Sequence, residues 1–169
     1  GDGVSPDRFV AEQVPALGRS KAISSRGDHA LALDEATSEV WAWGYNYNGQ
    51  LGNNSTTRSS FPVKVSGLAD AVEVSAGDAF SLARRSNGTV VAWGDNGYGQ
   101  IGDLTYAPRL TPVAVNSLSG VTRVSAGAVH GLALLAGGSV KAWGYGDDGQ
   151  LGDGLATSSN AVVSVATLT

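Results

Sequence analysis

The side chains best suited to chemistry are two histidines. His29 and His130 occupy equivalent positions in the first and third copies of an internal repeat, and Phe80 stands there in the second copy. An aromatic substitute favours packing, so we expect core histidines bonded to backbone groups. No nucleophile, base and acid recur together beside either histidine, and two distant histidines make a poor zinc site.

Acidic residues form a second candidate group, in the segments that join the strands. They are Asp95, Asp103, Asp147, Asp148 and Asp153. The segment 145–149 partly matches a calcium loop, but it lacks alternating oxygen ligands and a closing glutamate. The adjacent carboxylates suit no glycosidase pair, because neighbouring loop acids usually point apart. Since Asp, Asn and Gly commonly shape turns, we expect no catalytic residue, no metal site and no cofactor.

Tyrosines supply a third possibility, a surface that binds another protein. If equivalent loops meet on one face, tyrosines there can anchor a partner, because they bury much area at low entropic cost. The alternative is that they are turn residues packed on their own unit. The candidate partner-binding residues are Tyr45, Tyr47, Tyr98, Tyr106, Tyr145, Asp95 and Asp147.

A 50-residue repeat positions all of these groups. Trp-Gly recurs at 43–44, 93–94 and 143–144, and Gly-Gln-(Leu/Ile)-Gly recurs at 49–52, 99–102 and 149–152. This register divides the chain into a tail at 1–9, the last strand of a preceding unit at 10–17, and three units at 18–68, 69–118 and 119–169. The tryptophans are expected to fill the space between units, with each indole N–H bonded to a carbonyl. The glutamines are expected to tie together backbone segments of their loops.

Each unit is predicted to hold four short strands and no helix. In the second unit they lie near 71–75, 80–84, 89–93 and 111–115, and their Val, Ala, Ser and Trp residues suit covered sheets. Asn87-Gly88 predicts a type I′ hairpin turn with positive φ at both central positions, and Gly137-Gly138 predicts the same. In the first unit Arg26 replaces a glycine, so its turn is expected to be built differently. Four-stranded repeats of this length indicate an all-β propeller.

Composition excludes several classes of function. The 169 residues include 24 glycines and no cysteine, and the net charge is −4. Disulfides and thiolate metal sites are therefore excluded. The basic residues are scattered, with only Arg84-Arg85 adjacent, so no nucleic-acid partner is expected. No apolar run of about 18 residues exists, so no membrane insertion is expected, and the first residues do not resemble a signal peptide.

The pattern of Trp-Gly, Gly-Gln-Leu-Gly-Asp, Pro-Val, Ser-Ala-Gly and His-x-x-Ala-Leu resembles the regulator-of-chromosome-condensation repeat. Residues 143–153, 125–127 and 130–134 carry it most fully, and the resemblance covers 10–169. It implies a seven-bladed ring in which strands from two sequence repeats complete one sheet. The family includes an exchange factor for a small GTPase, which also binds chromatin, and a bacterial inhibitor of β-lactamases. The Ala-Trp-Gly form is similar to bacterial members, which suggests an exported or cell-surface protein.

These observations predict a non-catalytic propeller module that binds a protein of unknown identity through loops on one face. Two alternatives are a structural cell-surface or filament-forming repeat protein, and a propeller-type enzyme inhibitor. Three units leave open sheet edges at both ends, and open edges invite pairing. We therefore expect a homodimer or a fragment of a longer propeller. In a six-bladed dimer, segment 10–17 of one chain could complete the end sheet of the other.

Overall fold

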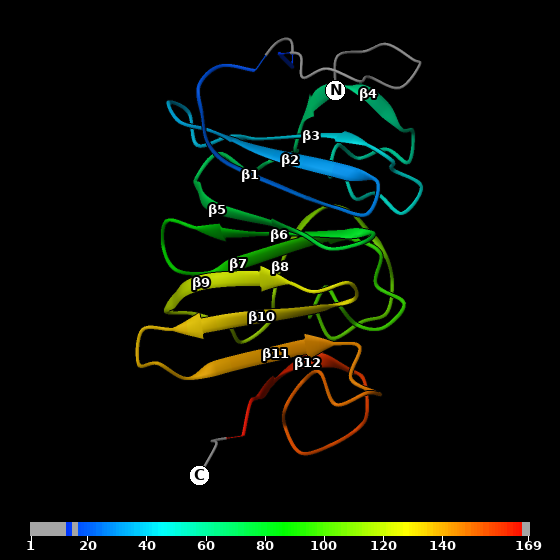
Figure 1. The fold of residues 1–169 in the computed structure, drawn as a ribbon, viewed down its shortest axis with the longest axis vertical. Coiled ribbons are helices and arrows are strands. Elements are labelled where there is room, and N and C mark those ends of the chain that lie inside the picture. The colour runs from blue at the N-terminus through cyan, green and yellow to red at the C-terminus, as the bar shows by residue number, and fades with distance from the viewer. Residues whose placement is uncertain (1–12, 15–16, 167–169) are drawn as a thin grey trace.

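The protein is described by a computed structural model that covers residues 13–14 and 17–166. These residues form twelve strands and no helix, arranged as three four-stranded antiparallel sheets. The sheets stack in chain order along the long axis of the molecule, as the blades of a propeller do (Figure 1). The prediction of an all-β arc of three blades is confirmed.

Each blade is built from consecutive strands. Blade 1 contains β1 (Ser20–Arg26), β2 (His29–Asp34), β3 (Val40–Gly44) and β4 (Ser59–Lys64). Blade 2 contains β5 (Ala71–Ala76), β6 (Phe80–Arg85), β7 (Val90–Gly94) and β8 (Arg109–Ala114). Blade 3 contains β9 (Val121–Ala126), β10 (His130–Leu135), β11 (Val140–Gly144) and β12 (Ser159–Ser164).

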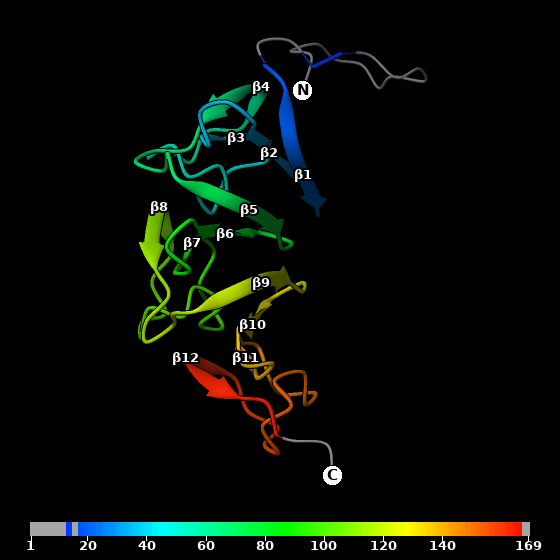
Figure 2. The ribbon, with the colours of Figure 1, turned by 90° about the vertical axis from the view of Figure 1, so that its left-hand side faces the viewer.

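Every sheet takes its four strands from a single unit of the register found in the sequence. The order is β1-β2-β3-β4 in blade 1, and the other blades follow the same order. The expectation that an end sheet needs a strand from elsewhere is therefore wrong. What lies open at the two ends is the face of a complete sheet, because the blades pack face to face (Figure 2). The segment predicted as a preceding strand, 10–17, lies mostly outside the described residues.

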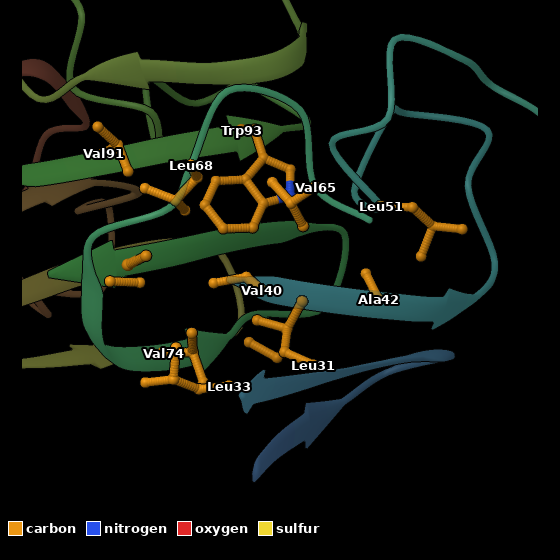
Figure 3. Close-up of a cluster of buried hydrophobic side chains, with 13 residues drawn as sticks. Leu31, Leu33, Val40, Ala42, Leu51, Val65, Leu68, Val74, Val91 and Trp93 are labelled. Carbon is orange, nitrogen blue, oxygen red and sulfur yellow. The ribbon is translucent and has the colours of Figure 1, made fainter. Parts of the chain in front are cut away.

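The hydrophobic core lies between the blades. Alternate residues of a strand point to opposite faces of its sheet. Leu31, Leu33 and Val40 of blade 1 therefore pack against Val91 and Trp93 of blade 2 (Figure 3). A second cluster joins blades 2 and 3 in the same way. Strand β7 is buried along its whole length, because blade 2 has a neighbour on each side.

The hairpin turns differ from the predicted type. Gly88 and Gly138 have positive φ, but Asn87 and Gly137 do not, so neither turn is type I′. Gly88 N–H donates to Arg85 C=O, and Asn87 Oδ1 accepts from Thr89 N–H. This arrangement fits a type I turn followed by a glycine in the left-handed region. Gly137-Gly138 adopts the same turn, because Gly138 N–H donates to Leu135 C=O.

The first turn of blade 1 differs from its equivalents, as predicted. Arg26 pairs directly with His29 across a short turn that contains Gly27. In blades 2 and 3 this connection is one residue longer, and Gly77 and Gly127 lie against the rings of Phe80 and His130. The described residues also contain no helix long and apolar enough to span a bilayer.

Candidate functional site

The long connections between the third and fourth strands of each blade lie on one face. They span 45–58, 95–108 and 145–158, and they project on the right of Figure 1. The short turns between the first and second strands lie beside them, because Tyr45 N–H donates to Asp28 C=O and Tyr145 N–H to Val129 C=O. We call this surface, with the turns 27–28, 77–79 and 127–129, the loop face.

Buried asparagines hold the first two long loops in shape. Asn46 is fully buried, and its Nδ2 donates to the carbonyls of Ser55 at 2.9 Å and Thr57 at 3.0 Å. Its Oδ1 accepts from Leu51 N–H. Asn96 makes the equivalent bonds in the second loop. Sequence reasoning missed these residues, although their 50-residue spacing was a signal.

The third loop uses a different support. Gly146 stands in place of the asparagine, and the Asp147 carboxylate accepts hydrogen bonds from Ser158 N–H at 3.0 Å and Oγ–H at 2.8 Å. The Asp95 carboxylate also bonds within its own loop, because it accepts a hydrogen bond from Gln100 Nε2 at 2.7 Å. Both candidate aspartates therefore shape their own loops, as Asp commonly does.

The repeated glutamines act within single loops. Gln100 Oε1 accepts from Tyr98 N–H, and Gln50 Oε1 accepts from Asn48 N–H. Their backbone carbonyls make the contact between blades, since Trp93 Nε1–H donates to Gln50 C=O at 2.8 Å and Trp143 to Gln100 at 2.9 Å. The predicted packing of these two tryptophans is confirmed. Trp43 is only half-buried, at the start of the arc.

Tyrosine side chains gather on the loop face. The rings of Tyr45 and Tyr47 contact each other at a tilt of 54°, with centroids 4.6 Å apart. Tyr98 of blade 2 and Tyr145 of blade 3 meet edge to face at 4.9 Å, which makes the aromatic surface continuous across two blades. Tyr47, Tyr98 and Tyr106 are exposed, whereas Tyr145 is half-buried. The nearby Asp148 carboxylate raises the pKa of Tyr145, so its hydroxyl stays protonated and can donate.

Charge is unequally divided between the two faces. The loop face carries one arginine, Arg58, with Arg26 and Arg109 at the strand ends beside it, against seven aspartates, Asp28, Asp78, Asp95, Asp103, Asp147, Asp148 and Asp153. Arg26 pairs with Asp78 at 2.7 Å, and Arg109 Nε donates to Asp103 at 2.6 Å, so the remaining surface is strongly negative. On the opposite face Arg84 and Arg85 pair with Glu73 and Asp70, each at 2.9 Å. The adjacent basic pair is therefore largely neutralised.

His29 is a structural link between blades. It is buried, and its Nε2 lies 2.9 Å from Ser81 Oγ, a side-chain partner in the neighbouring blade that the sequence did not predict. Ser81 Oγ–H donates to Gln50 C=O at 2.9 Å. The serine must therefore accept from His29, which places the ring proton on Nε2. The buried Nδ1 has no hydrogen-bond partner of good geometry among the described residues.

We expect the purified chain to hold no tightly bound calcium or zinc. Within the described residues no three His, Asp or Glu side chains come together, and the loop carboxylates already bond their own loops. Elemental analysis after dialysis should find well under one ion per chain. A stoichiometric ion whose removal lowers the melting temperature would contradict this structural role.

Solved structures with this fold are propellers. Human WBSCR16 is 24% identical and matches with a TM-score of 0.77, over 87% of this chain and 38% of that chain. Yeast RCC1 (Prp20), in a complex with Kap60, is 20% identical with a TM-score of 0.80, over 90% of this chain and 38% of that one. The ectodomain of the Physcomitrella patens receptor kinase CR4 is 26% identical with a TM-score of 0.54, over 83% and 35%. This chain therefore spans well under half the length of these proteins, and no curated protein matches its sequence significantly.

Family comparison gives a direct assignment. The regulator of chromosome condensation (RCC1) repeat matches residues 38–84 and 87–134, and a second description of that repeat matches 71–100 and 121–150. The match at 38–84 joins β3 and β4 of one blade to β5 and β6 of the next, so the family repeat is offset from the blade as expected. The matches at 38–84 and 87–134 cover more than half of the sequence, and the chain belongs to the RCC1 repeat family.

Proposed function

We propose that this protein is a non-catalytic interaction module whose loop face binds a positively charged segment of another protein. The observation that carries the proposal is that exposed tyrosines share one face with aspartates, most of which form no ion pair with another described residue. Tyrosine rings attract cations through their faces, and carboxylates form charge-assisted bonds with arginine and lysine. A basic segment crossing blades 2 and 3 would meet both kinds of group.

The arrangement of the face supports binding better than catalysis. The aspartates with clear loop bonds, such as Asp95 and Asp147, fix the backbone that presents Tyr98 and Tyr145. A rigid loop loses less entropy on binding than a mobile one. RCC1 propellers generally act as binding platforms, and solved structures of yeast RCC1 (Prp20) concern its binding to Kap60, to Gsp1p and to histones. For this chain the partner is defined only by its charge.

We expect an arginine-rich peptide to bind the loop face at low salt, and an acidic peptide of equal length not to bind. Isotope-labelled protein titrated with each peptide should show amide shifts confined to 45–58, 95–108 and 145–158. The double variant Tyr98→Ala/Tyr145→Ala should weaken binding at least tenfold, which corresponds to about 1.4 kcal/mol. Phe61→Ala, at an exposed aromatic ring of β4 outside the loop face, serves as the matched control.

Two results would contradict the proposal. One is equal binding of the basic and acidic peptides. The other is a shift pattern centred on the opposite face, where Lys64, Lys141 and Arg123 lie. A pure charge effect would weaken with salt yet ignore the tyrosine substitutions. That outcome would show that the tyrosines do not contribute to peptide binding.

The second candidate function is enzyme inhibition, in which one rigid loop inserts into the active-site cleft of a hydrolase. Leu155 is 61% exposed in the third loop, and the preceding Gly154 has positive φ. An exposed apolar side chain on a supported loop suits insertion into a pocket. Inhibition of a panel of serine hydrolases by the wild type, lost in Leu155→Ala, would favour this function over the binding of a basic segment.

A further inference from the structure

The sequence contains three Asn-Gly dipeptides, at 48–49, 87–88 and 96–97, and the fold places them in three different environments. An asparagine before glycine is especially open to attack by the next backbone nitrogen on its side-chain amide, because glycine has no Cβ to hinder the approach. Asn87 is exposed, Asn48 is half-buried and Asn96 is fully buried. The same dipeptide therefore meets different constraints at each place.

Hydrogen bonds hold the side chain of Asn96. Its Oδ1 accepts from Ile101 N–H at 3.0 Å, and its Nδ2 donates to the carbonyls of Thr105 and Ala107, each at 3.0 Å. The amide cannot rotate toward Gly97 N without breaking these bonds, and a buried polar group left without its partner is costly. We expect no reaction at this position while the protein is folded.

Packing protects Asn48 in a different way. Gly49 is buried, its N–H donates to Asn46 C=O at 2.9 Å, and a Cβ built on it would lie 2.5 Å from the Leu110 side chain. A bond between Gly49 N and the Asn48 side chain would require the backbone to move. Leu110 of the next blade leaves no room for that movement.

Asn87 has neither protection. It lies in the exposed turn between β6 and β7, and its Nδ2 forms no hydrogen bond with another described residue. Its Oδ1 accepts twice from Thr89, from the N–H at 3.0 Å and from the Oγ1–H at 2.7 Å. The space beside Gly88 is open, since a Cβ built there would meet nothing nearer than 3.5 Å.

The two donors of Thr89 suit the chemistry of this attack. When Gly88 N loses its proton and bonds to Asn87 Cγ, negative charge develops on Oδ1, and fixed donors aimed at that oxygen stabilise it. The Cγ–Nδ2 bond then breaks, Nδ2 leaves as ammonia, and a succinimide ring remains. Water opens this ring at Cγ to give aspartate, or at the backbone carbonyl of residue 87 to give isoaspartate.

We propose that Asn87 is a site of spontaneous deamidation, which the fold selects from the three Asn-Gly dipeptides. The bond from Gly88 N–H to Arg85 C=O at 3.0 Å must open first, and a local fluctuation of the exposed turn is enough to open it. The proposal does not depend on the function of the loop face, because this turn lies at the opposite end of the strands.

The modification affects the contact between blades 2 and 3. Gly88 C=O accepts a hydrogen bond from Val121 N–H of blade 3 at 3.0 Å. Isoaspartate adds one carbon to the main chain directly before Gly88, so it displaces this carbonyl and weakens the contact. Aspartate adds only a charge and keeps the acceptor oxygen that Thr89 bonds.

Incubation of the folded protein, beside the same chain in urea, tests whether the fold selects the site. Samples kept at neutral pH are digested, and the three Asn-Gly peptides are followed by liquid chromatography with mass spectrometry. In the folded protein, products should accumulate at Asn87 about tenfold or more faster than at Asn48 or Asn96, since those two sites need a larger opening of the structure. In urea the three sites should react at similar rates.

Substitutions in the turn test the chemistry. Thr89→Val removes the hydroxyl donor and should slow the reaction at Asn87, whereas Thr89→Ser keeps the hydroxyl and should react like the wild type. Asn87→Gln should stop it, because the longer side chain does not form the succinimide. Protein that contains isoaspartate, isolated by chromatography, should melt at a lower temperature than Asn87→Asp, which has the same charge on an unaltered backbone.

Circular dichroism and thermal melts verify that each variant folds, and Thr89→Ala replaces Thr89→Val if the latter does not. A folded-state rate at Asn87 no higher than the rate at Asn48 or Asn96 would overturn the proposal. An undiminished rate in folded Thr89→Val would overturn the part assigned to the hydroxyl. Equal melting temperatures of the isoaspartate form and Asn87→Asp would overturn the effect on the contact between blades.

Discussion

Trp93→Ala is expected to lower the free energy of unfolding by about 3–5 kcal/mol, the usual cost of deleting a buried aromatic side chain. The indole is fully buried between blades 1 and 2 and packs with Leu31, Leu33 and Val40 (Figure 3). Its Nε1–H is bonded to Gln50 C=O, so the substitution leaves a cavity and removes a donor. Urea denaturation followed by far-ultraviolet circular dichroism measures the loss, at one protein concentration for all variants.

Two matched variants divide this loss into its causes. Trp93→Phe keeps most of the volume and removes the N–H, and its cost should be about 1–2 kcal/mol because Ser81 still donates to the same carbonyl. Trp43→Ala alters the equivalent but half-buried ring and should cost less than Trp93→Ala. A loss below about 1 kcal/mol for Trp93→Ala, with unchanged cooperativity, would contradict the packing role of the ring.

Acidification is expected to remove about 3 kcal/mol of stability through His29 alone. Burial lowers the pKa of His29 to about 4 from 6.5, and the backbone of Arg26 with the carboxylates of Asp28 and Asp78 only partly offsets this. The folded protein therefore holds the ring neutral while the unfolded chain protonates it. The contribution is complete above pH 6.5, falls as the pH drops below that value, and is fully lost near pH 4.

Phe80 provides a natural control for this effect, because it occupies the equivalent buried position in blade 2. His29→Phe should remove the pH dependence between 6.5 and 4 that the wild type shows beyond its carboxylate titrations. Stability measured by urea denaturation at half-unit steps gives the difference curve. Parallel curves for the two proteins would show that His29 titrates normally. His130→Phe should change the curve less, since His130 is half-buried and burial lowers its pKa less.

Much of the architecture could be predicted from the sequence, because the repeat imposes its own register. Tryptophans 50 residues apart in identical contexts must occupy equivalent places, so three blades and their inward tryptophans follow from spacing alone. The same logic places equivalent loops, and hence most of the tyrosines, on one face. The turn type was not predictable from Asn87-Gly88, because the dipeptide fits two hairpin geometries, and Gly137-Gly138 adopts the same one as Asn87-Gly88.

The candidate site was only partly predictable. Tyr98 and Tyr145 are 47 residues apart, and their edge-to-face contact exists only because two blades are adjacent. The division of charge between the faces also needs the strand directions, which determine the face on which each acidic or basic residue lies. The role of buried Asn46 in bonding the backbone of its own loop was not predictable, because an asparagine in a glycine-rich loop has the features of an ordinary turn residue.

By itself the sequence determined the repeat, the four-stranded unit, the buried tryptophans and the family. These are local or periodic properties, and the sequence of each copy indicates them independently of the other copies. Only the tertiary structure decided which residues are neighbours. It shows that His29 forms a hydrogen bond with Ser81 of the neighbouring blade, and that Ile23 is exposed whereas the equivalent Val74 is buried. Equivalent residues in a repeat have nearly the same chemistry, and burial is a property of the neighbour. Among the described blades only blade 2 has a neighbour on each side, and no pattern within one unit distinguishes it from blades 1 and 3.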